Sequence, residues 1–159
     1  MAQTSTQQAS TAAATLTKPS VTIQRRYNAP PEKVYAAWTH AEMIVGWFGP
    51  SDAEQGSVKA MMDVRTGGRF TISFTHSNGE YSEVSGVYKE VVPNQKLVFS
   101  WAWHSTPERE SQVTILTQPA ASGTLLTLKH EQFFDQAAAD GHKRGWTGTM
   151  EKLAAYLGE

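Results

Sequence analysis

A run of strand-like segments, followed by one long helical segment, is the sequence feature that most constrains this fold. Between residues 57 and 131, apolar side chains recur at alternate positions and short turns separate the segments. The turn at Asn78-Gly79 is of the type that most strongly favours a hairpin. Strands joined by such short turns form an antiparallel sheet. The predicted strands cover residues 57–64, 69–76, 81–91, 97–104, 110–117 and 124–131.

The last segment, about residues 136–157, has helical periodicity. Asp135 precedes it and is suited to cap its first turn. The apolar positions recur every three or four residues, at His142, Trp146, Met150, Leu153 and Leu157. At ~1.5 Å per residue such a helix is about 30 Å long. A sheet with one apolar face must cover that face, and this is the only predicted element long enough to do so.

Another strand and two short helices precede this run. Residues 21–27 begin with β-branched side chains in alternation, which favours a strand. Pro31 suits the first turn of a helix, and the pattern predicts two helices at about 31–39 and 41–47. The predicted fold class is α+β. We expect a curved antiparallel sheet of about seven strands wrapped around a long C-terminal helix, with two short helices after the first strand.

The first twenty residues differ from the rest of the chain. They are almost entirely Ser, Thr, Gln and Ala, with a single charge at Lys18. Such a segment buries too little apolar surface to offset the entropy of ordering it. We therefore expect a disordered tail over residues 1–20 and one domain over residues 21–159. The tail lacks the basic start and apolar core of a secretory signal, which predicts a cytoplasmic location.

Composition excludes several kinds of function. The chain has no cysteine, which excludes thiol chemistry and cysteine-ligated metal sites. Its net charge is −1, so it lacks the basic character typical of nucleic-acid and anionic-membrane binding. The five histidines show no metal-site spacing, and no phosphate-binding loop, dinucleotide fingerprint or G-x-S-x-G motif occurs. The sequence therefore predicts no metal, no cofactor and no nucleic-acid or membrane partner.

Six segments together resemble a known family. They are APPEKVYAAWT (29–39), WFGP (47–50), DVRTGGRF (63–70), YKEVVPNQKLVFSW (88–101), LTLKHE (126–131) and GHKRGW (141–146). In this order they are similar to the START-like (SRPBCC) helix-grip superfamily, and within it to the bacterial family homologous to the activator of heat-shock protein 90 ATPase. The resemblance covers about residues 21–157 and implies the helix-grip fold. The superfamily includes lipid carriers, hormone receptors, polyketide cyclases, antibiotic-sequestering proteins and co-chaperones, so the fold does not supply a function.

Large aromatic side chains fall on the phase that should face the long helix. They either fill a solid core or line a pocket for a small molecule, and apolar sites with a few polar groups are typical of such pockets. Trp47 and Phe48 are expected to seal the core, or alternatively to cap the pocket mouth. Ser73 is a further polar candidate. The predicted ligand-binding residues are Phe70, Phe74, Tyr88, Trp101, Trp103, His130, His142 and Trp146.

Titratable residues give two expectations. His130 and His142 should approach each other in this fold, either as polar groups with satisfied hydrogen bonds, which we favour, or as a catalytic or ligand-facing pair. Three carboxylates, at Glu108, Glu110 and Glu131, are nearest the apolar faces, but general acid–base work needs a desolvated group near a substrate. Solvated edges are the favoured interpretation, and no catalytic residue is predicted.

Three glycines lie on one stripe of the long helix. They are Gly141, Gly145 and Gly148, and each costs about 1 kcal/mol relative to alanine in a helix interior. The stripe indicates that the helix passes close to another backbone or leaves room beside Trp146. A frayed helix start is the alternative.

Three functions remain open. The first is non-enzymatic binding of an apolar or aromatic small molecule, polycyclic or polyketide-like, with a sequestration or stress-resistance role. The second is a co-chaperone-like module that acts on a heat-shock ATPase. The third is a cyclase or hydrolase that uses His130, Glu131 or His142. A cavity of several hundred Å³ that reaches solvent favours a ligand or a substrate, whereas a filled interior with an exposed apolar patch favours a protein partner.

Overall fold

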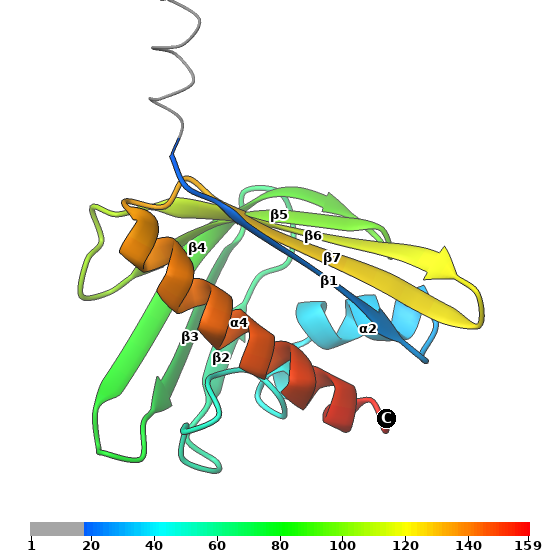
Figure 1. Cartoon of the computed structure of the whole chain (residues 1–159), viewed down its shortest axis with the longest axis horizontal. Coiled ribbons are helices and arrows are strands. Elements are labelled where there is room, and N and C mark those ends of the chain that lie inside the picture. Colours follow the sequence, from blue (N-terminus) through cyan, green and yellow to red (C-terminus); the bar gives the residue numbers. More distant parts are fainter. Residues whose placement is uncertain (1–17) are drawn as a thin grey trace, which may run out of the picture.

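The computed structural model describes residues 18–159, which form the predicted order of elements (Figure 1). Of the predicted tail, only residues 18–20 lie within the described part. There the Pro19 carbonyl accepts a hydrogen bond from the Phe133 N–H at 3.2 Å. The elements are β1 Val21–Tyr27, α2 Pro31–Thr39, α3 Ala41–Ile44, β2 Lys59–Met62, β3 Arg69–Thr75, β4 Tyr81–Val92, β5 Lys96–Trp103, β6 Ser111–Ala120, β7 Gly123–Glu131 and α4 Gln136–Tyr156.

The strands form one sheet of seven, in the order β1-β7-β6-β5-β4-β3-β2. Every neighbouring pair is antiparallel, so β2 to β7 form a meander and β1 adds to its β7 edge. The long helix α4 crosses one face of the sheet, and α2 lies on the same side (Figure 1). The predicted α+β helix-grip fold is confirmed. Within residues 18–159 no helix is both long and apolar enough to cross a membrane.

The sheet bends around α4 at a glycine and a bulge in β4. An added Cβ at Gly86 would overlap the carbonyl oxygen of Ser100 on β5, so only glycine allows this close approach. The Val87 N–H donates to Ser100 Oγ at 2.8 Å, and the β4–β5 register shifts between Tyr88 and Glu90. Bulges bend a strand and increase its twist. This bend curves the sheet around the helix.

Two predicted elements are shorter than expected. The strand at 57–64 is reduced to β2, Lys59–Met62, an edge strand on which Met61 is 77% exposed. The helix at 41–47 ends at Ile44, after which Gly46 and Trp47 donate to carbonyls three residues back.

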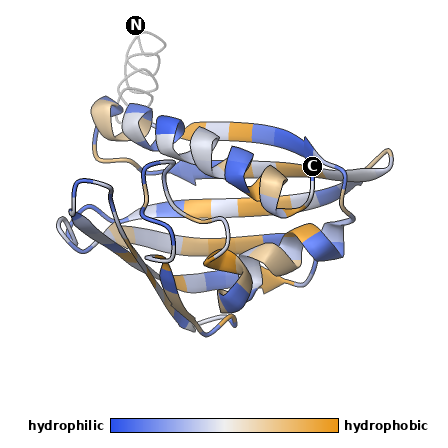
Figure 2. Ribbon diagram, turned by 90° about the horizontal axis from the view of Figure 1, so that it is seen from below, coloured by the Kyte–Doolittle hydropathy of each residue, from blue (hydrophilic) through white to orange (hydrophobic). Residues whose placement is uncertain are grey.

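Orange hydrophobic segments recur along the strands in Figure 2, whereas α4 carries more blue and pale residues. By hydropathy, the strands are therefore more apolar than α4.

Candidate ligand-binding site

A cavity of about 430 Å³ lies between the N-terminal half of α4 and the sheet, and it reaches solvent. This volume is within the range of small-molecule sites. Its aromatic lining comes from Phe48, Phe74, Trp101, Trp103 and Trp146. The remaining lining residues are Gly49, Pro50, His76, Ser82, Ser105, Ala138, Gly141, His142, Gly145 and Thr149. The cavity is thus apolar, with a few polar groups.

Glycines on α4 leave this space open. Gly141 and Gly145 line the cavity, and an added Cβ at Gly145 would meet no atom within 4 Å. The helix is regular here, since Asp135 Oδ1 accepts the Ala138 N–H at 2.9 Å as its cap. A frayed start therefore does not account for these glycines. At these two positions α4 borders the cavity with backbone rather than with a side chain.

The other half of the helix–sheet interface is filled. Phe70 and Tyr88 lie there, around a cavity of only about 20 Å³ that Trp38 and Ile44 also border. The Phe70 ring packs 5.6 Å from the Tyr88 ring and 5.3 Å from the Phe99 ring, measured between centroids. These two predicted site residues therefore lie outside the large cavity. Ser73 alternates with Ile72 and Phe74 along β3, so it lies on the opposite face of the sheet.

His130 is fully buried and belongs to a chain of hydrogen bonds. Trp146 Nε1–H donates to His130 Nδ1 at 3.0 Å, so His130 Nε2 carries the proton and donates to Ser111 Oγ at 2.7 Å. Ser111 then donates to the Trp101 carbonyl at 3.3 Å. Burial, with a smaller effect from His142, lowers the pKa of His130 to about 2. His130 is thus a neutral structural group that holds Trp146 from behind the cavity.

His142 lines the cavity and is also fully paired. Its Nδ1–H donates to the Ala138 carbonyl at 2.8 Å, and its Nε2 accepts Trp103 Nε1–H at 2.8 Å. Burial lowers the pKa of His142 below its ordinary value. The His130 and His142 rings lie 5.0 Å apart, but both nitrogens of each ring are engaged elsewhere. The two histidines therefore orient two tryptophans, in agreement with the favoured expectation of satisfied hydrogen bonds.

Trp47 takes the expected sealing role, whereas Phe48 separates the two halves of the interface instead of capping the cavity mouth. Trp47 is 1% exposed and donates its indole N–H to the Ala37 carbonyl at 3.1 Å, so it seals the core. Phe48 instead borders the large cavity, with its ring centroid 6.2 Å from that of Trp101 and 6.1 Å from that of Trp146. Phe48 is therefore the partition between the filled half and the open half.

The loop after Phe48 is held in place by α4. Lys152 Nζ donates to the carbonyls of Phe48, Gly49 and Pro50 at 3.4, 3.2 and 3.3 Å. Thr149 Oγ1 adds a hydrogen bond to the Gly49 carbonyl at 3.0 Å. Partial burial lowers the pKa of Lys152. This clamp fixes one wall of the cavity, and sequence reasoning missed it because Lys152 lies off the apolar stripe of the helix.

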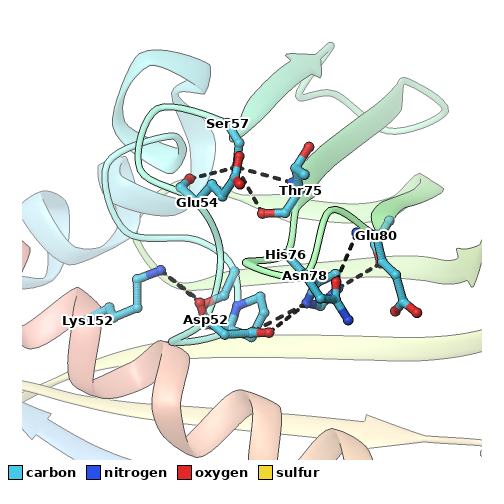
Figure 3. Close-up of polar contacts among 11 residues, drawn as sticks. Asp52, Glu54, Ser57, Thr75, His76, Asn78, Glu80 and Lys152 are labelled. Carbon is cyan, nitrogen blue, oxygen red and sulfur yellow. Dashed lines mark hydrogen bonds and ion pairs between the residues drawn. The ribbon is translucent and has the colours of Figure 1, made fainter.

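Polar side chains gather at the mouth of the cavity, where no local sequence pattern predicted them. Figure 3 shows two of them, Asp52 and His76. His76 and Ser82 line the cavity, and Asp52 contacts His76 from the loop after α3. The carboxylates that the sequence singled out lie elsewhere. Glu108 and Glu110 are exposed, and Glu131 is half-buried and 3.6 Å from Lys129 Nζ. None of these three carboxylates lines the cavity.

The grip of the sheet on α4, with an aromatic cavity between them, defines a helix-grip protein of the START-like class. The chain belongs to the family described as Activator of Hsp90 ATPase homolog 1-like protein, whose model matches residues 28–158. The resemblance seen in the sequence is thereby confirmed. No curated protein matches the chain.

Solved structures share the fold. A protein from Chromobacterium violaceum is 22% identical with a TM-score of 0.76, over 88% of this chain and 97% of that one. The AHSA1 protein from Silicibacter pomeroyi is 26% identical with a TM-score of 0.75, over 87% and 97%. A protein from Mesorhizobium loti is 27% identical with a TM-score of 0.69, over 87% and 96%. Folds of this family often bind hydrophobic ligands.

Proposed function

We propose that this protein binds an apolar, aromatic small molecule in the cavity between α4 and the sheet. The observation that carries the proposal is the cavity of about 430 Å³, lined by five aromatic side chains, beside an interface that is otherwise filled. Burial of apolar ligand surface would contribute about 25 cal/mol per Å². Such an apolar site favours ligands with a large apolar surface over charged ligands.

The shape of the cavity favours a flat ligand. Gly141 and Gly145 present helix backbone on one side, whereas Phe74 and Trp103 present rings on the other. A planar polycyclic or polyketide-like molecule would stack on those rings and lie against the glycines. A sequestration or stress-resistance role and a cytoplasmic location stay predictions from the sequence.

The alternatives have less support. A co-chaperone surface would need exposed large apolar side chains. Val45 and Tyr156 lie near each other, since an added Cβ at Gly46 would meet the Tyr156 ring, whereas Met61, Tyr81 and Phe134 belong to other parts of the chain. The guanidinium of Arg109 lies 4.0 Å from the Phe134 ring centroid and covers it in part. A cyclase or hydrolase that uses His130 or His142 would need a free ring nitrogen, and all four nitrogens are engaged.

Titration with 1-aminoanthracene, a neutral planar fluorescent probe, tests the proposal. We expect a saturable gain in probe emission excited through tryptophan, because Trp101, Trp103 and Trp146 line the cavity. Trp103→Phe should reduce this energy transfer, whereas Trp47→Phe, the same exchange in the filled half, should change it less. A linear, unsaturable response of the wild-type protein would contradict the proposal.

A further inference from the structure

Three side chains at the cavity mouth form a connected chain of hydrogen bonds. His76 Nδ1 lies 3.1 and 3.3 Å from the two carboxylate oxygens of Asp52. His76 Nε2 lies 3.0 Å from Ser82 Oγ. Figure 3 shows Asp52 and His76 pointing toward one another, with Lys152 approaching the loop that carries Asp52. A carboxylate, an imidazole and a hydroxyl are thus linked in the order Asp52, His76, Ser82.

The backbone brings these residues together from three separate segments. Ser82 pairs with Phe74 across β3 and β4, so it sits diagonally from His76, which follows the last residue of β3. The Ala53–His76 bridge aligns the loop that carries Asp52, and the Asp52 carbonyl accepts the Ser77 N–H at 2.9 Å. The arrangement is therefore held by main-chain hydrogen bonds on both sides of the imidazole.

The hydrogen-bond partners fix where the protons lie. The Asp52 carboxylate only accepts, so His76 Nδ1–H donates to it and Nε2 is left as an acceptor for the Ser82 hydroxyl. A nucleophile bonded to a base, with the base oriented by a third group, is the arrangement that activates serine in acyl transfer. His130 and His142 differ in this respect, since a tryptophan N–H occupies their acceptor nitrogens.

The chain of hydrogen bonds opens onto the cavity. Both His76 and Ser82 line it, and the Phe74 ring packs 5.2 Å from the His76 ring. The His76 side chain is 23% exposed and that of Asp52 is 52% exposed, so solvent reaches the outer end. A molecule held by the aromatic wall would therefore place a polar substituent beside Ser82 Oγ, with water available at the mouth.

We propose that Asp52, His76 and Ser82 hydrolyse carboxylic esters of flat apolar alcohols bound in this cavity. Ser82 Oγ attacks the ester carbonyl carbon as its proton moves to His76 Nε2. The ester C–O bond then breaks, and His76 returns that proton to the departing alcohol. Water, deprotonated by the same nitrogen, cleaves the acyl group from Ser82 and restores its hydroxyl. One ester and one water give one acid and one alcohol.

Hydrolysis of 2-naphthyl acetate, followed by naphthol fluorescence, tests this proposal. Ser82→Ala and His76→Gln should each lower kcat/KM by about 100-fold or to background. Asp52 is a positioning residue, so Asp52→Asn should lower kcat by at least about tenfold with little change in KM. Ser85→Ala is the matched control, because Ser85 lies in the same strand on the opposite face, and it should keep the wild-type rate. A fluorophosphonate probe should label Ser82 in the wild-type protein.

The proposal uses the same cavity as the proposed ligand binding, and two assays separate their failures. If 1-aminoanthracene binds saturably but Ser82→Ala hydrolyses the ester at the wild-type rate, or Ser82 takes no label, the hydrolysis proposal is overturned and ligand binding stands. If the probe does not bind but Ser82-dependent hydrolysis occurs, the hydrolysis proposal stands without the proposed ligand. If neither is seen, both are overturned.

Discussion

The two halves of the helix–sheet interface share one sheet face but differ in how it is covered. In the filled half, Trp38 and Ile44 from the short helices pack onto Phe70 and Phe99, and a space of about 20 Å³ remains. In the open half the sheet is as aromatic, but it is covered by the glycine-bearing start of α4 and the loop at residues 48–50, and about 430 Å³ remains. Apolar side chains alternate along the strands in the same way in both halves. The difference therefore comes from the segments that cover the sheet.

The two halves are expected to contribute differently, the filled half to stability and the open half to the proposed ligand binding. Close packing in the filled half contributes to folding, and changes in volume there are felt strongly. The open half forgoes those contacts and also carries two glycines in a helix interior, where alanine would be more stable by about 1 kcal/mol each. Residues that lower stability and cluster at one place are typical of a binding site.

The largest expected contrast is between two tryptophans. Trp47→Ala should lower the free energy of unfolding by about 3–5 kcal/mol, since it empties a closed site and orphans the Ala37 carbonyl. Trp103→Ala should cost roughly half as much, because Trp103 is half-buried and already borders open space. Urea unfolding at equilibrium measures both. Equal losses would remove the distinction between the halves.

Acid should destabilise the protein through His130. The folded-state pKa of about 2 lies below the ordinary value of 6.5, so below pH 6.5 the unfolded chain takes up a proton that the folded protein does not. Stability is therefore lost as the pH falls, by roughly 2–3 kcal/mol between pH 6.5 and 4.5. His142, whose pKa burial also lowers, adds to the loss.

Unfolding measured across this pH range checks the sign and the source. His130→Gln should flatten the pH dependence by about one proton. Met150→Leu, a buried and non-titrating exchange, should shift the whole curve and keep its slope. A slope in His130→Gln as steep as in the wild-type protein would assign the effect to other groups.

The clamp on the cavity wall should have a smaller effect. Lys152→Met removes three charge-assisted hydrogen bonds to residues 48–50 and should cost about 1 kcal/mol. Lys143→Met, an exposed exchange on the same helix, should stay within about 0.5 kcal/mol. Thermal unfolding of the pair is the measurement. Equal losses of stability in the two variants would show that Lys152 does not hold the loop.

The smallest expected changes in stability have the opposite sign. Gly145→Ala and Gly148→Ala should each stabilise α4 by about 0.5–1 kcal/mol, because an added Cβ meets nothing within 4 Å at either position. Only Gly145 lines the cavity, so only Gly145→Ala should weaken binding of 1-aminoanthracene. Destabilisation by Gly145→Ala would contradict this, because it would mean that another group packs closely against Gly145, which the structure does not show.

The sequence was sufficient for the fold, because strand alternation, the Asn78-Gly79 turn and the Asp135 cap are local signals. It was sufficient for only part of the site. Strand phase shows which face a side chain is on, but not where along that face it lies. Phe70 and Phe74 share a phase but lie about 13 Å apart along β3, which puts them in different halves.

Contacts that depend on register could not be predicted at all. The meeting of Asp52, His76 and Ser82 requires the β3–β4 pairing and the path of the loop after α3, and neither is written in a local pattern. The neutral state of His130 likewise depends on its burial, which exists only in the folded protein.

A larger side chain in the open half would show whether the ligand binds there. Gly145→Leu places a side chain in the cavity, and Gly148→Leu places the same side chain on the same helix outside it. Fluorescence titration with 1-aminoanthracene should give saturable binding to the wild-type protein and to Gly148→Leu, and at least about tenfold weaker binding to Gly145→Leu. Wild-type affinity in a folded Gly145→Leu variant would contradict the account, because the ligand would then bind somewhere other than the space that the glycines leave open.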